Sequence, residues 1–453
     1  MFRRSIVTPL LAAFCFLLIV TGLYLEREHL TWPSSSYIPV EPDKLQQSDA
    51  TPTSTKAGTS TQLPTRTSSK PSPTATTLSS PTISNGTILS AERISPYISA
   101  ILDSKSTVLP RLKCPTLNVD RYSILQSHGS PLDEDNQDHK IDYFFALNLR
   151  NCKDLLPRLL RSIVETVRFL GIDRCALSIV EGNSPDGTSD ILLALEPFFK
   201  DLGLTYFYSN SKINPAKSAR IRKLAQLRNL ALEPLVNKKV SVSDDTTVLF
   251  LNDVAACAED ILELALQKRS LNADMTCGMD WTYAGDNPTF YDQWCARTIK
   301  GDSFFEVGLD GNWNSAWNLF PNDLETRSRY DAKKPFQVFA CWNGAITITA
   351  TPFLHGLRFR DVHEKECGQG EPTLLCKDLW HRGYKRIAVV PSVNLEYSDK
   401  RAADIKKLKG YVSDIIEGQE NDGAIQWIFE PPEQVKCMPT WENQFWRPWN
   451  ETL

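Results

Sequence analysis

An asparagine and an aspartate directly follow a short apolar segment of the chain. The segment comprises residues 248–251, and Asn252 and Asp253 come next. Oxygen ligands at the carboxyl end of a buried strand can hold a divalent cation that bridges a diphosphate. Asp253 can equally cap the helix that we expect to begin near Glu259. Position alone leaves both interpretations open.

A turn rich in glycine, with one proline, follows a second apolar segment, residues 176–180. The turn covers residues 181–188, begins with Glu181 and contains Asp186. Its carboxylates and backbone N–H groups could hold the ribose and base of a nucleotide. Taken alone, the pattern favours an ordinary loop between a strand and a helix.

Residues 217–228 carry five basic side chains and no acidic one. A helix that starts with this charge is a natural partner for a diphosphate. Arg220 and Arg228 are eight residues apart and can share one face of the helix. The alternative is a solvated basic surface, which is the commoner role of any single lysine or arginine.

Glu371 and Pro372 fit the first turn of a helix, which Gly383 would end. A carboxylate at such a helix start can point into a cleft and act on a sugar hydroxyl. It can instead simply stabilise the helix dipole. Asp378 lies seven residues later on the same face and is a second candidate.

The elements that must position these side chains alternate along the chain. This alternation predicts an α/β domain with a mainly parallel sheet and right-handed crossovers, in which ligands bind beyond the carboxyl ends of the strands. The expected strands are residues 143–147, 176–180, 204–208, 248–251 and 384–390, and the expected helices are residues 155–170, 189–202 and 218–236.

Composition limits the function classes. The chain has 453 residues, 42% of them hydrophobic and 23% charged, so it can bury a core. A net charge of −4 argues against a dedicated nucleic-acid partner. The chain holds six histidines and lacks the P-loop, the Gly-x-Gly-x-x-Gly and the Gly-x-Ser-x-Gly motifs. Metal sites built on histidine and serine hydrolases therefore have little support.

The N-terminal region predicts a membrane anchor and a stem. Residues 6–25 carry no charge, and Arg3 and Arg4 precede them, so residues 1–5 are expected to be cytosolic and residues 6–25 to be a signal anchor. A cleaved signal peptide is the alternative. Residues 48–87 hold 21 Ser and Thr and five Pro, so we assign residues 26–110 to a disordered, Ser/Thr/Pro-rich stem. Residues 111–453 form the expected lumenal domain.

Cysteines and sequons agree with a lumenal domain. Ten cysteines follow the predicted anchor, an even set for which disulfides are plausible, although their pairing cannot be deduced from sequence. Asn85 and Asn450 lie in glycosylation sequons, which fit a glycoprotein of the secretory route.

The order of these pieces resembles the GT-A glycosyltransferase layout. Several stretches are similar to the fungal capsule-associated α-1,3-mannosyltransferases of glycosyltransferase family 69, between about residues 140 and 400. The strings that carry the resemblance are LRNLALEPL (227–235), VLFLNDV (248–254), GMDW (278–281), FYDQW-x-AR (290–297), FQVFACWNG (336–344) and LLCKDLW (374–380).

The resemblance implies a GT-A fold, which is a Rossmann-like nucleotide-diphospho-sugar transferase domain. It also implies GDP-mannose as the donor, a divalent cation such as Mn²⁺, and transfer to the 3-hydroxyl of a mannoside acceptor with retention of the α configuration. An anchor and stem of this kind are typical of Golgi enzymes. We therefore expect a single-pass type II membrane protein of the Golgi or another secretory-pathway membrane.

The resemblance also suggests roles for individual residues. Asp253 is the expected metal ligand. The nucleotide-sugar is expected to contact Glu181, Asp186, Arg220, Arg228 and Asn252. The donor sugar and acceptor are expected to lie between Trp281, Trp342 and Asn343. The carboxylate that acts at the anomeric centre is expected to be Glu371 or Asp280, with Asp378 as a further candidate.

Three other functions stay open on sequence alone. A glycosyltransferase that uses another nucleotide sugar, such as UDP-xylose, is the nearest alternative. A non-catalytic carbohydrate-binding surface protein would bind glycan without a nucleotide. A structural cell-wall mannoprotein would more typically carry repeats or wall-attachment signals than an α/β domain.

Overall fold

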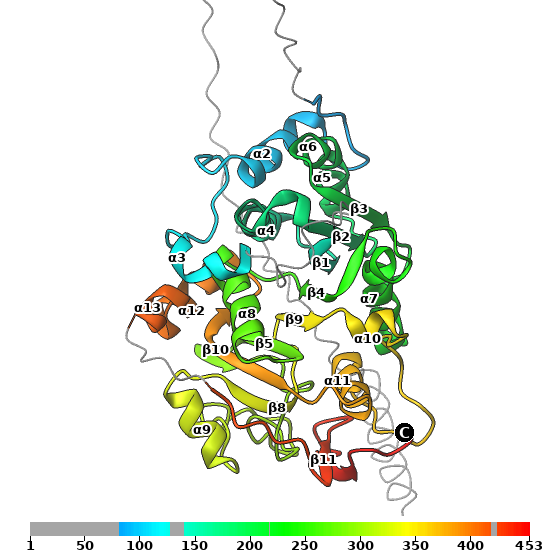
Figure 1. Ribbon diagram of the computed structural model, residues 1–453, viewed down its shortest axis with the longest axis vertical. Helices are drawn as coiled ribbons and strands as arrows, with labels where there is room; N and C mark the ends of the chain where they lie inside the picture. The colour runs from blue at the N-terminus through cyan, green and yellow to red at the C-terminus, as the bar shows by residue number, and fades with distance from the viewer. Residues whose placement is uncertain (1–80, 127–139, 217, 418–423) are drawn as a thin grey trace, which may run out of the picture. The chain divides into compact units, whose positions relative to one another are not determined.

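We describe the protein from a computed structural model, which describes residues 81–126, 140–216, 218–417 and 424–453 (Figure 1). The predicted anchor, residues 6–25, and most of the predicted stem lie outside the described residues. Within the described ranges, no helix is both long enough and apolar enough to cross a membrane.

Ten strands form one sheet within the described part of the chain (Figure 1). Its order is β3-β2-β1-β4-β9-β5-β10-β8-β7, and β6 pairs with β5 outside this path. The strands are β1 (Ile141–Leu149), β2 (Cys175–Glu181), β3 (Thr205–Asn210), β4 (Val242–Leu251), β5 (Met275–Ala284), β6 (Asn287–Phe290), β7 (Arg297–Thr298), β8 (Phe336–Ala340), β9 (Ala345–Thr349) and β10 (Ile387–Leu395). A separate hairpin joins β11 (Gln434–Cys437) and β12 (Phe445–Pro448).

One half of the sheet is parallel and the other half is mixed. Strands β3, β2, β1 and β4 all pair in parallel, as the alternation of strands and helices predicts. Strand β9 runs antiparallel between β4 and β5, and β8 runs antiparallel to β10. The mainly parallel sheet that we expected is therefore correct for the first half only, because β9 reverses direction after a tight turn.

Helices cover both faces of the sheet. Those with a part in the argument are α2 (Ala91–Leu102), α4 (Leu156–Leu170), α5 (Thr188–Ala194), α6 (Glu196–Leu202), α7 (Arg220–Val236), α8 (Ala258–Ser270), α9 (Leu324–Asp331), α11 (Glu371–His381) and α12 (Asp399–Lys409). Helices α4 and α8 pack into one apolar core, and α7 and α11 pack into the other, on the opposite face. The expected helix over residues 189–202 is divided at Leu195, because Pro197 opens α6.

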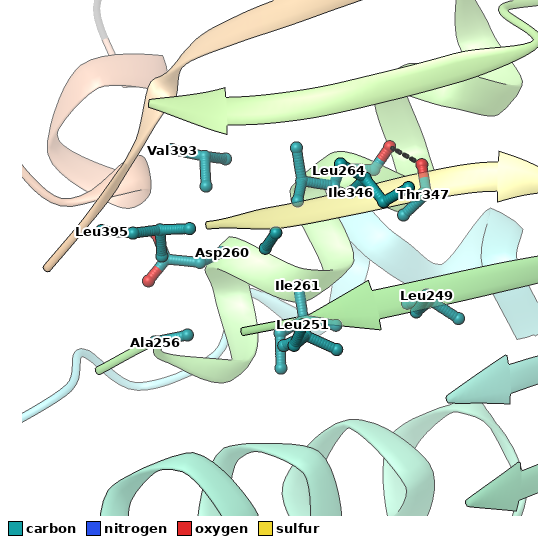
Figure 2. A pocket seen from close by; sticks show the side chains of 11 residues that line it. Leu249, Leu251, Ala256, Asp260, Ile261, Leu264, Ile346, Thr347, Val393 and Leu395 are labelled. Carbon is teal, nitrogen blue, oxygen red and sulfur yellow. Dashed lines mark hydrogen bonds between the residues drawn. The ribbon is translucent and has the colours of Figure 1, made fainter. Parts of the chain in front are cut away.

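The first core is closely packed around α8. Figure 2 shows a cavity between β4, β9 and α8, lined mostly by aliphatic side chains that include Leu249, Ile261 and Val393. Its volume is about 10 Å³, which barely admits one water molecule. It is therefore a packing defect of the core and offers no room for a sugar or a nucleotide.

The folded domain begins earlier than residue 111, where we placed its start. Helix α2 packs on α4 and buries Ile94, Ile98 and Ile101. Just before it, the carboxylate of Asp190 on α5 accepts hydrogen bonds from the backbone N–H groups of residues 87–89, at 2.7–2.9 Å. Part of the predicted stem is thus built into the domain.

Three disulfides link distant segments in the described part of the chain. They join Cys114 to Cys257, Cys277 to Cys341 and Cys367 to Cys437. The first fastens the segment after α2 to the start of α8, and the second ties β5 to the residue that follows β8. Disulfide bonding is thus confirmed, while Cys152, Cys175, Cys295 and Cys376 remain thiols.

Candidate active site

Arg228 and Glu371 form a buried ion pair between α7 and α11. Arg228 Nε lies 2.8 Å from Glu371 Oε1, and the two side chains are only 7% and 3% exposed. The guanidinium also lies 4.1 Å from the ring centroid of Trp342, so that a cation–π contact holds its other face. Arg228 is thereby fixed in position, and Glu371 is its counter-ion.

Asn252 connects this pair to the end of β4. Its side-chain oxygen accepts hydrogen bonds from Trp342 Nε1, at 3.0 Å, and from Arg228 Nη1, at 3.5 Å. Its backbone N–H donates to the carbonyl of Gly344 at 2.8 Å. The structure therefore brings Asn252, Arg228, Trp342 and Glu371 into one network, as four of the expected site residues.

Two further carboxylates meet at β5. The backbone N–H of Asp292 donates to Asp280 Oδ1 at 3.3 Å, and the hydroxyl of Tyr397 donates to Asp280 Oδ2 at 2.5 Å. Burial and then the charge of Asp292 raise the pKa of Asp280 well above its ordinary value. Burial raises the pKa of Asp292 to about 6. Asp292, with a pKa of about 6, is therefore mainly ionised at neutral pH.

A tight turn joins the two groups. Asn343 and Gly344 both have positive φ, at 55° and 81°. Asn343 donates its backbone N–H to Asp292 Oδ2 at 2.7 Å and its side-chain N–H to the carbonyl of Gly278 at 2.8 Å. A Cβ at Gly344 would lie 3.2 Å from the Cβ of Asp280, so glycine permits the close approach. The turn orients Asp292 beside Asp280.

Asp253 follows β4 at the edge of this group. Burial raises its pKa to about 6, although the nearby charges of Arg228 and Arg220 act in the opposite direction. No group of three or more His, Cys, Asp or Glu side chains suited to a metal occurs among the residues that the structure describes.

Glu181 and Asp186 have structural partners in their own turn. Glu181 is fully buried and accepts hydrogen bonds from the backbone N–H groups of Asn183 and Ser184, at 3.1 and 2.8 Å. Asp186 accepts from the backbone and hydroxyl of Thr188, at 3.0 and 2.7 Å. Both carboxylates shape the turn, as the loop interpretation predicts.

Polar atoms that still need a partner lie beside that turn, at the end of β1. The buried atoms Asn148 Oδ1, Arg150 Nε and Asn151 Oδ1 have no hydrogen-bond partner among the described residues. Buried polar atoms without a partner are uncommon in folded proteins. Strand β1 pairs with β2 and β4, so these atoms lie between the Glu181 turn and Asp253 in the order of the sheet.

Trp281 lies apart from the network. It follows Asp280 in β5, so its side chain points to the opposite face of the sheet. Its indole N–H donates to Asn394 Oδ1 at 2.9 Å, and its ring contacts Phe290. Trp342 and Asn343 are both buried, and their hydrogen bonds lie inside the network. Neither presents an open face to a sugar.

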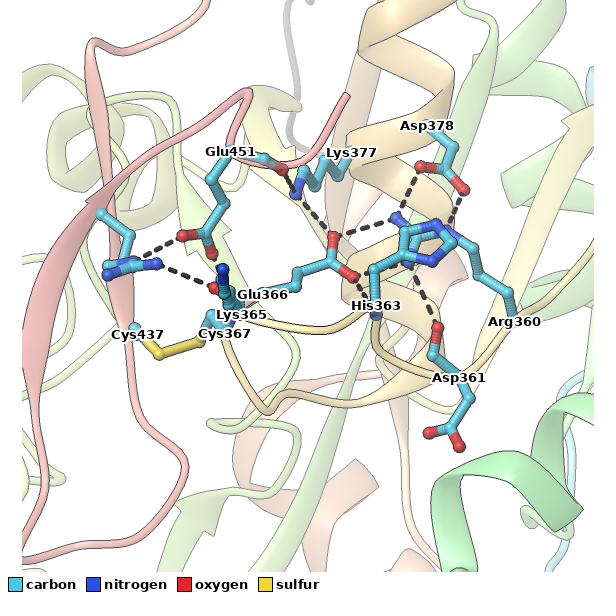
Figure 3. A network of polar contacts seen from close by, with 11 residues as sticks. Arg360, Asp361, His363, Lys365, Glu366, Cys367, Lys377, Asp378, Cys437 and Glu451 are labelled. Atoms are coloured by element: carbon cyan, nitrogen blue, oxygen red, sulfur yellow. Dashed lines mark hydrogen bonds and ion pairs between the residues drawn. A yellow bond between two sulfur atoms is a disulfide. The ribbon is translucent and has the colours of Figure 1, made fainter.

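Asp378 belongs to a second polar cluster (Figure 3). Arg360 donates to both Asp378 and Glu366, with distances of 2.7–3.0 Å. The ammonium of Lys377 lies 2.6 Å from Glu366 Oε1. Although Asp378 and Glu371 are both on α11, Asp378 is paired with Arg360 and is not part of the network around Arg228.

Sequence reasoning did not identify Asp292 and Tyr397 as site residues. Asp292 was visible only inside the string FYDQW, since it lies in a loop after β6 without strand or helix periodicity. Tyr397 follows β10, which is far from Asp280 in sequence. Only the pairing of β10 with β5 brings the two together.

Together, the mixed α/β sheet and the carboxylates gathered at β4 and β5 place the candidate site at the edge of the sheet where ligands bind in α/β folds. Comparison with known proteins identifies the family. The model of the family described as Cryptococcal mannosyltransferase 1 matches residues 142–378. Alpha-1,3-mannosyltransferase CMT1 of Cryptococcus neoformans var. neoformans serotype D is 36% identical over 341 residues, which are 68% of this chain and 72% of that protein. The chain belongs to this mannosyltransferase family and is a glycosyltransferase.

Solved structures give weaker likenesses. Staphylococcus aureus TarS 1–349 matches with a TM-score of 0.34 and 15% identity, over 62% of this chain and 67% of that one. The mannosyltransferase PcManGT from Pyrobaculum calidifontis, described in complex with GDP-Man and Mn²⁺, matches with a TM-score of 0.35 and 10% identity, over 64% and 66%.

Proposed function

We propose that this protein is a GT-A-type, retaining α-1,3-mannosyltransferase that transfers mannose from GDP-mannose to the 3-hydroxyl of a mannoside acceptor. The observation that carries the proposal is the buried network of Arg228, Glu371, Asp280 and Asp292. It lies where β4 and β5 end and wholly within the segment that matches the mannosyltransferase family. The name of the C. neoformans relative supports the α-1,3 linkage.

The donor nucleotide would bind over the ends of β1 and β4. Asn148 Oδ1 and Asn151 Oδ1 are acceptors suited to the N–H groups of a guanine, and Arg150 Nε is a donor. Arg220, at the start of α7, supplies positive charge near Asp253, where the diphosphate is expected. Glu181 and Asp186 would act indirectly, by holding the turn beside β1.

The residues at Asp253 fit a divalent cation such as Mn²⁺. A cation of this type is commonly held by one or two carboxylates together with substrate phosphates, and Asp253 offers one half-buried carboxylate beside the amide of Asn252. When bound, the cation would neutralise charge on the leaving diphosphate. Arg228 lies close enough to Asp253 to lower the pKa of that carboxyl. Its positive charge would also stabilise the negative charge on the leaving diphosphate.

The carboxylates divide into two roles. Asp292 is mainly ionised at neutral pH, so it can stabilise positive charge at the anomeric carbon or orient the acceptor hydroxyl. Asp280, bonded to Tyr397, holds Asp292 in place through the Asp292 backbone. Glu371 holds the Arg228 guanidinium in position, and it would affect the rate through that arginine.

A donor screen tests the proposal. The purified protein would be incubated with GDP-mannose, UDP-xylose and other GDP- and UDP-sugars, with a mannoside acceptor and Mn²⁺. We expect product only from GDP-mannose, and NMR should show a new α-1,3 linkage. The Asp292→Asn variant should lose activity, whereas Asp310→Asn, an exposed carboxylate elsewhere, should keep it. Transfer from UDP-xylose, or GDP-independent glycan binding without transfer, would contradict the proposal.

The cellular setting of this reaction is also part of the proposal. Residues 6–25 would anchor the enzyme as a single-pass type II protein of the Golgi membrane, with the domain in the lumen. The uncharged N-terminal segment and the three disulfides support this arrangement. Protease protection of a tagged protein in intact membrane vesicles tests it, since a lumenal domain should resist digestion until detergent is added.

A further inference from the structure

Residues 86–89, which we call the clamp segment, are bonded to the helix that follows the Glu181 turn. Asp190 on α5 is buried, and its carboxylate accepts hydrogen bonds from three consecutive backbone N–H groups, those of residues 87–89, at 2.7–2.9 Å. A carboxylate that accepts several backbone hydrogen bonds is a strong anchor. The clamp segment is therefore fixed to α5, although 101–103 residues of chain separate the bonded groups.

Two glycines let the clamp segment lie directly against this turn. A Cβ at Gly187, where φ is +95°, would lie 2.5 Å from Leu89 Cδ1, and a Cβ at Gly86 would lie 2.2 Å from Asp190 Cγ. Both distances are too short for a side chain, so only glycine permits the close approach. Leu89 is buried in the first core. The clamp segment and the turn are thus in direct contact, and a displacement of one must displace the other.

The same turn holds the residues that follow β1. The side chains of Ser184, Asp186 and Thr188 accept hydrogen bonds from the backbone N–H groups of residues 151–153, at 2.8–3.2 Å. Asn151 has a positive φ of 52°, which is uncommon outside glycine. The turn therefore fixes the course of the backbone where β1 ends, beside the buried polar atoms that have no partner among the described residues.

We propose that the clamp segment positions the site of the donor nucleotide. Leu89 and Asp190 hold the turn at residues 181–188, and the turn holds residues 151–153, which form part of the expected contact with the nucleobase. Such a contiguous series of contacts can transmit a displacement from one end to the other. That the end of β1 contacts the donor rests on the proposed function. Leu89 and Asp190 are positioning residues, because they act through the turn.

A consequence follows for the predicted stem. Its last part, the clamp segment, would affect donor affinity, whereas composition assigns that region to a spacer without a role in the reaction. A merely structural clamp would instead change the stability of the domain and leave donor affinity unaltered. Affinity and stability must therefore be measured on the same variants.

Steady-state kinetics and calorimetric titration with GDP and Mn²⁺, both on the full chain, test the proposal. Leu89→Ala removes the packing on Gly187, and Asp190→Asn replaces an acceptor oxygen by an NH₂ group that cannot accept. Each variant should raise the KM for GDP-mannose and the Kd for GDP about tenfold and leave kcat almost unchanged, because the displaced groups contact the nucleotide and not the reacting atoms. Leu89→Met keeps most of the packing and should restore donor affinity.

Leu125→Ala is the matched control. Leu125 is a buried leucine of the same core, and its carbonyl accepts a hydrogen bond from Tyr143, near the opposite end of β1. This variant should lower the melting temperature as Leu89→Ala does, yet leave the KM and the Kd unchanged. Hydrogen–deuterium exchange adds a readout that needs no ligand: the amides of residues 151–153 and 181–188 should exchange faster in Leu89→Ala and not in Leu125→Ala.

Two outcomes would overturn the proposal. If Leu89→Ala and Asp190→Asn melt earlier but bind GDP as the wild type does, the clamp segment only stabilises the fold. If Leu125→Ala weakens GDP binding equally, the loss reflects a general loosening of the core. A wild-type protein that uses a UDP-sugar instead would contradict the proposed function alone, because the same variants would then be compared with UDP.

Discussion

Helix α11 contributes to two charged clusters, which differ in the direction in which the pKa of a carboxyl group is shifted. Near its first residue, Glu371 pairs with Arg228 beside the carboxylates Asp280 and Asp292 (Candidate active site). Further along, Asp378 and Glu366 share Arg360, and Lys377 also contacts Glu366 (Figure 3). We call the first the strand-end cluster and the second the α11 cluster.

The pKa values of Glu366 in one cluster and of Asp280 and Asp292 in the other are shifted in opposite directions. Hydrogen bonds from Arg360, His363 and Lys377 overcome the effect of burial and lower the pKa of Glu366 to about 2. In the strand-end cluster, burial raises the pKa of Asp292 to about 6 and raises that of Asp280 well above its ordinary value. Carboxylates whose partners satisfy them stabilise a fold, whereas carboxylates held without enough partners are typical of functional sites.

Removal of the charge at Asp253 should give the largest effect on rate. We expect Asp253→Asn to lower kcat about 10²–10³-fold, because the leaving diphosphate loses its stabilisation. The melting temperature should not fall, since ionisation of this half-buried carboxyl is already unfavourable. Asp245→Asn, an exposed carboxylate at the opposite end of β4, is the matched control. A folded Asp253→Asn enzyme with more than about a tenth of the normal rate would contradict the metal-ligand assignment, and a helix cap is no alternative because Cys257 and Asp260 cap α8.

Substitution of the two acids of α11 compares the clusters directly. Glu371→Gln should lower kcat at least about 10²-fold, because Arg228 is no longer held in position to stabilise the leaving diphosphate. It should also destabilise the fold by up to about 3–5 kcal/mol, because Arg228 keeps a buried charge without a counter-ion. Asp378→Asn should cost about 1.5–3 kcal/mol and leave kcat almost unaltered. Steady-state kinetics and thermal unfolding of both variants separate rate from stability, and equal loss of rate in both would erase the distinction.

The sequence allowed one half of the sheet to be predicted and much less of the other. Strands β1 to β4 alternate with helices, and this pattern determines parallel pairing. The insertion of β9 between β4 and β5 depends on long-range pairing that no local pattern encodes. Helix α2 was assigned to the stem because its neighbours are rich in Ser and Thr, although its own buried isoleucines mark it as folded.

The site was predictable where a residue adjoins a regular element. Asp253 follows a strand and Glu371 begins a helix, so their positions could be inferred. Asp292 lies in an irregular loop, and its partnership with Asp280 arises from the turn at Asn343. Asp280 and Trp281 are consecutive in β5, so their side chains lie on opposite faces of the sheet, and only Asp280 adjoins the network around Arg228.

The raised pKa of Asp253 predicts a pH dependence of donor binding. Below about pH 6 the carboxyl is protonated in the free enzyme, and bound Mn²⁺ must displace that proton. Affinity for GDP with Mn²⁺ should therefore fall up to about tenfold per pH unit as the pH drops below about 6, and level off above it. Titration calorimetry in buffers of different ionisation enthalpy should detect the released proton.

Two variants separate Asp253 from its neighbour. Asp253→Asn should bind more weakly and lose this pH dependence, whereas Asp292→Asn should keep it, although both carboxyls have a pKa of about 6 in the folded protein. If the pH dependence disappears with Asp292→Asn instead, the metal ligand has been assigned to the wrong carboxylate.

The smallest expected effect is on stability and concerns the α11 cluster. There the pKa of Glu366 is lowered, whereas the pKa of Asp253 is raised. The folded-state pKa of Glu366 is about 2, below the ordinary value of about 4.3 that applies to the unfolded chain. Its contribution to stability is therefore complete above about pH 4.3 and is lost as the pH falls toward 2, because the unfolded state binds the proton first. Wild-type stability should decline across this range more steeply than that of Glu366→Gln. Urea unfolding at several pH values between about 5 and 2.5 measures the two slopes.

Glu417→Gln, at a glutamate outside both clusters, should follow the wild-type slope. Equal slopes for the wild type and Glu366→Gln would mean that Arg360 and Lys377 do not hold Glu366 ionised, and the contrast between the two clusters would then lose its basis.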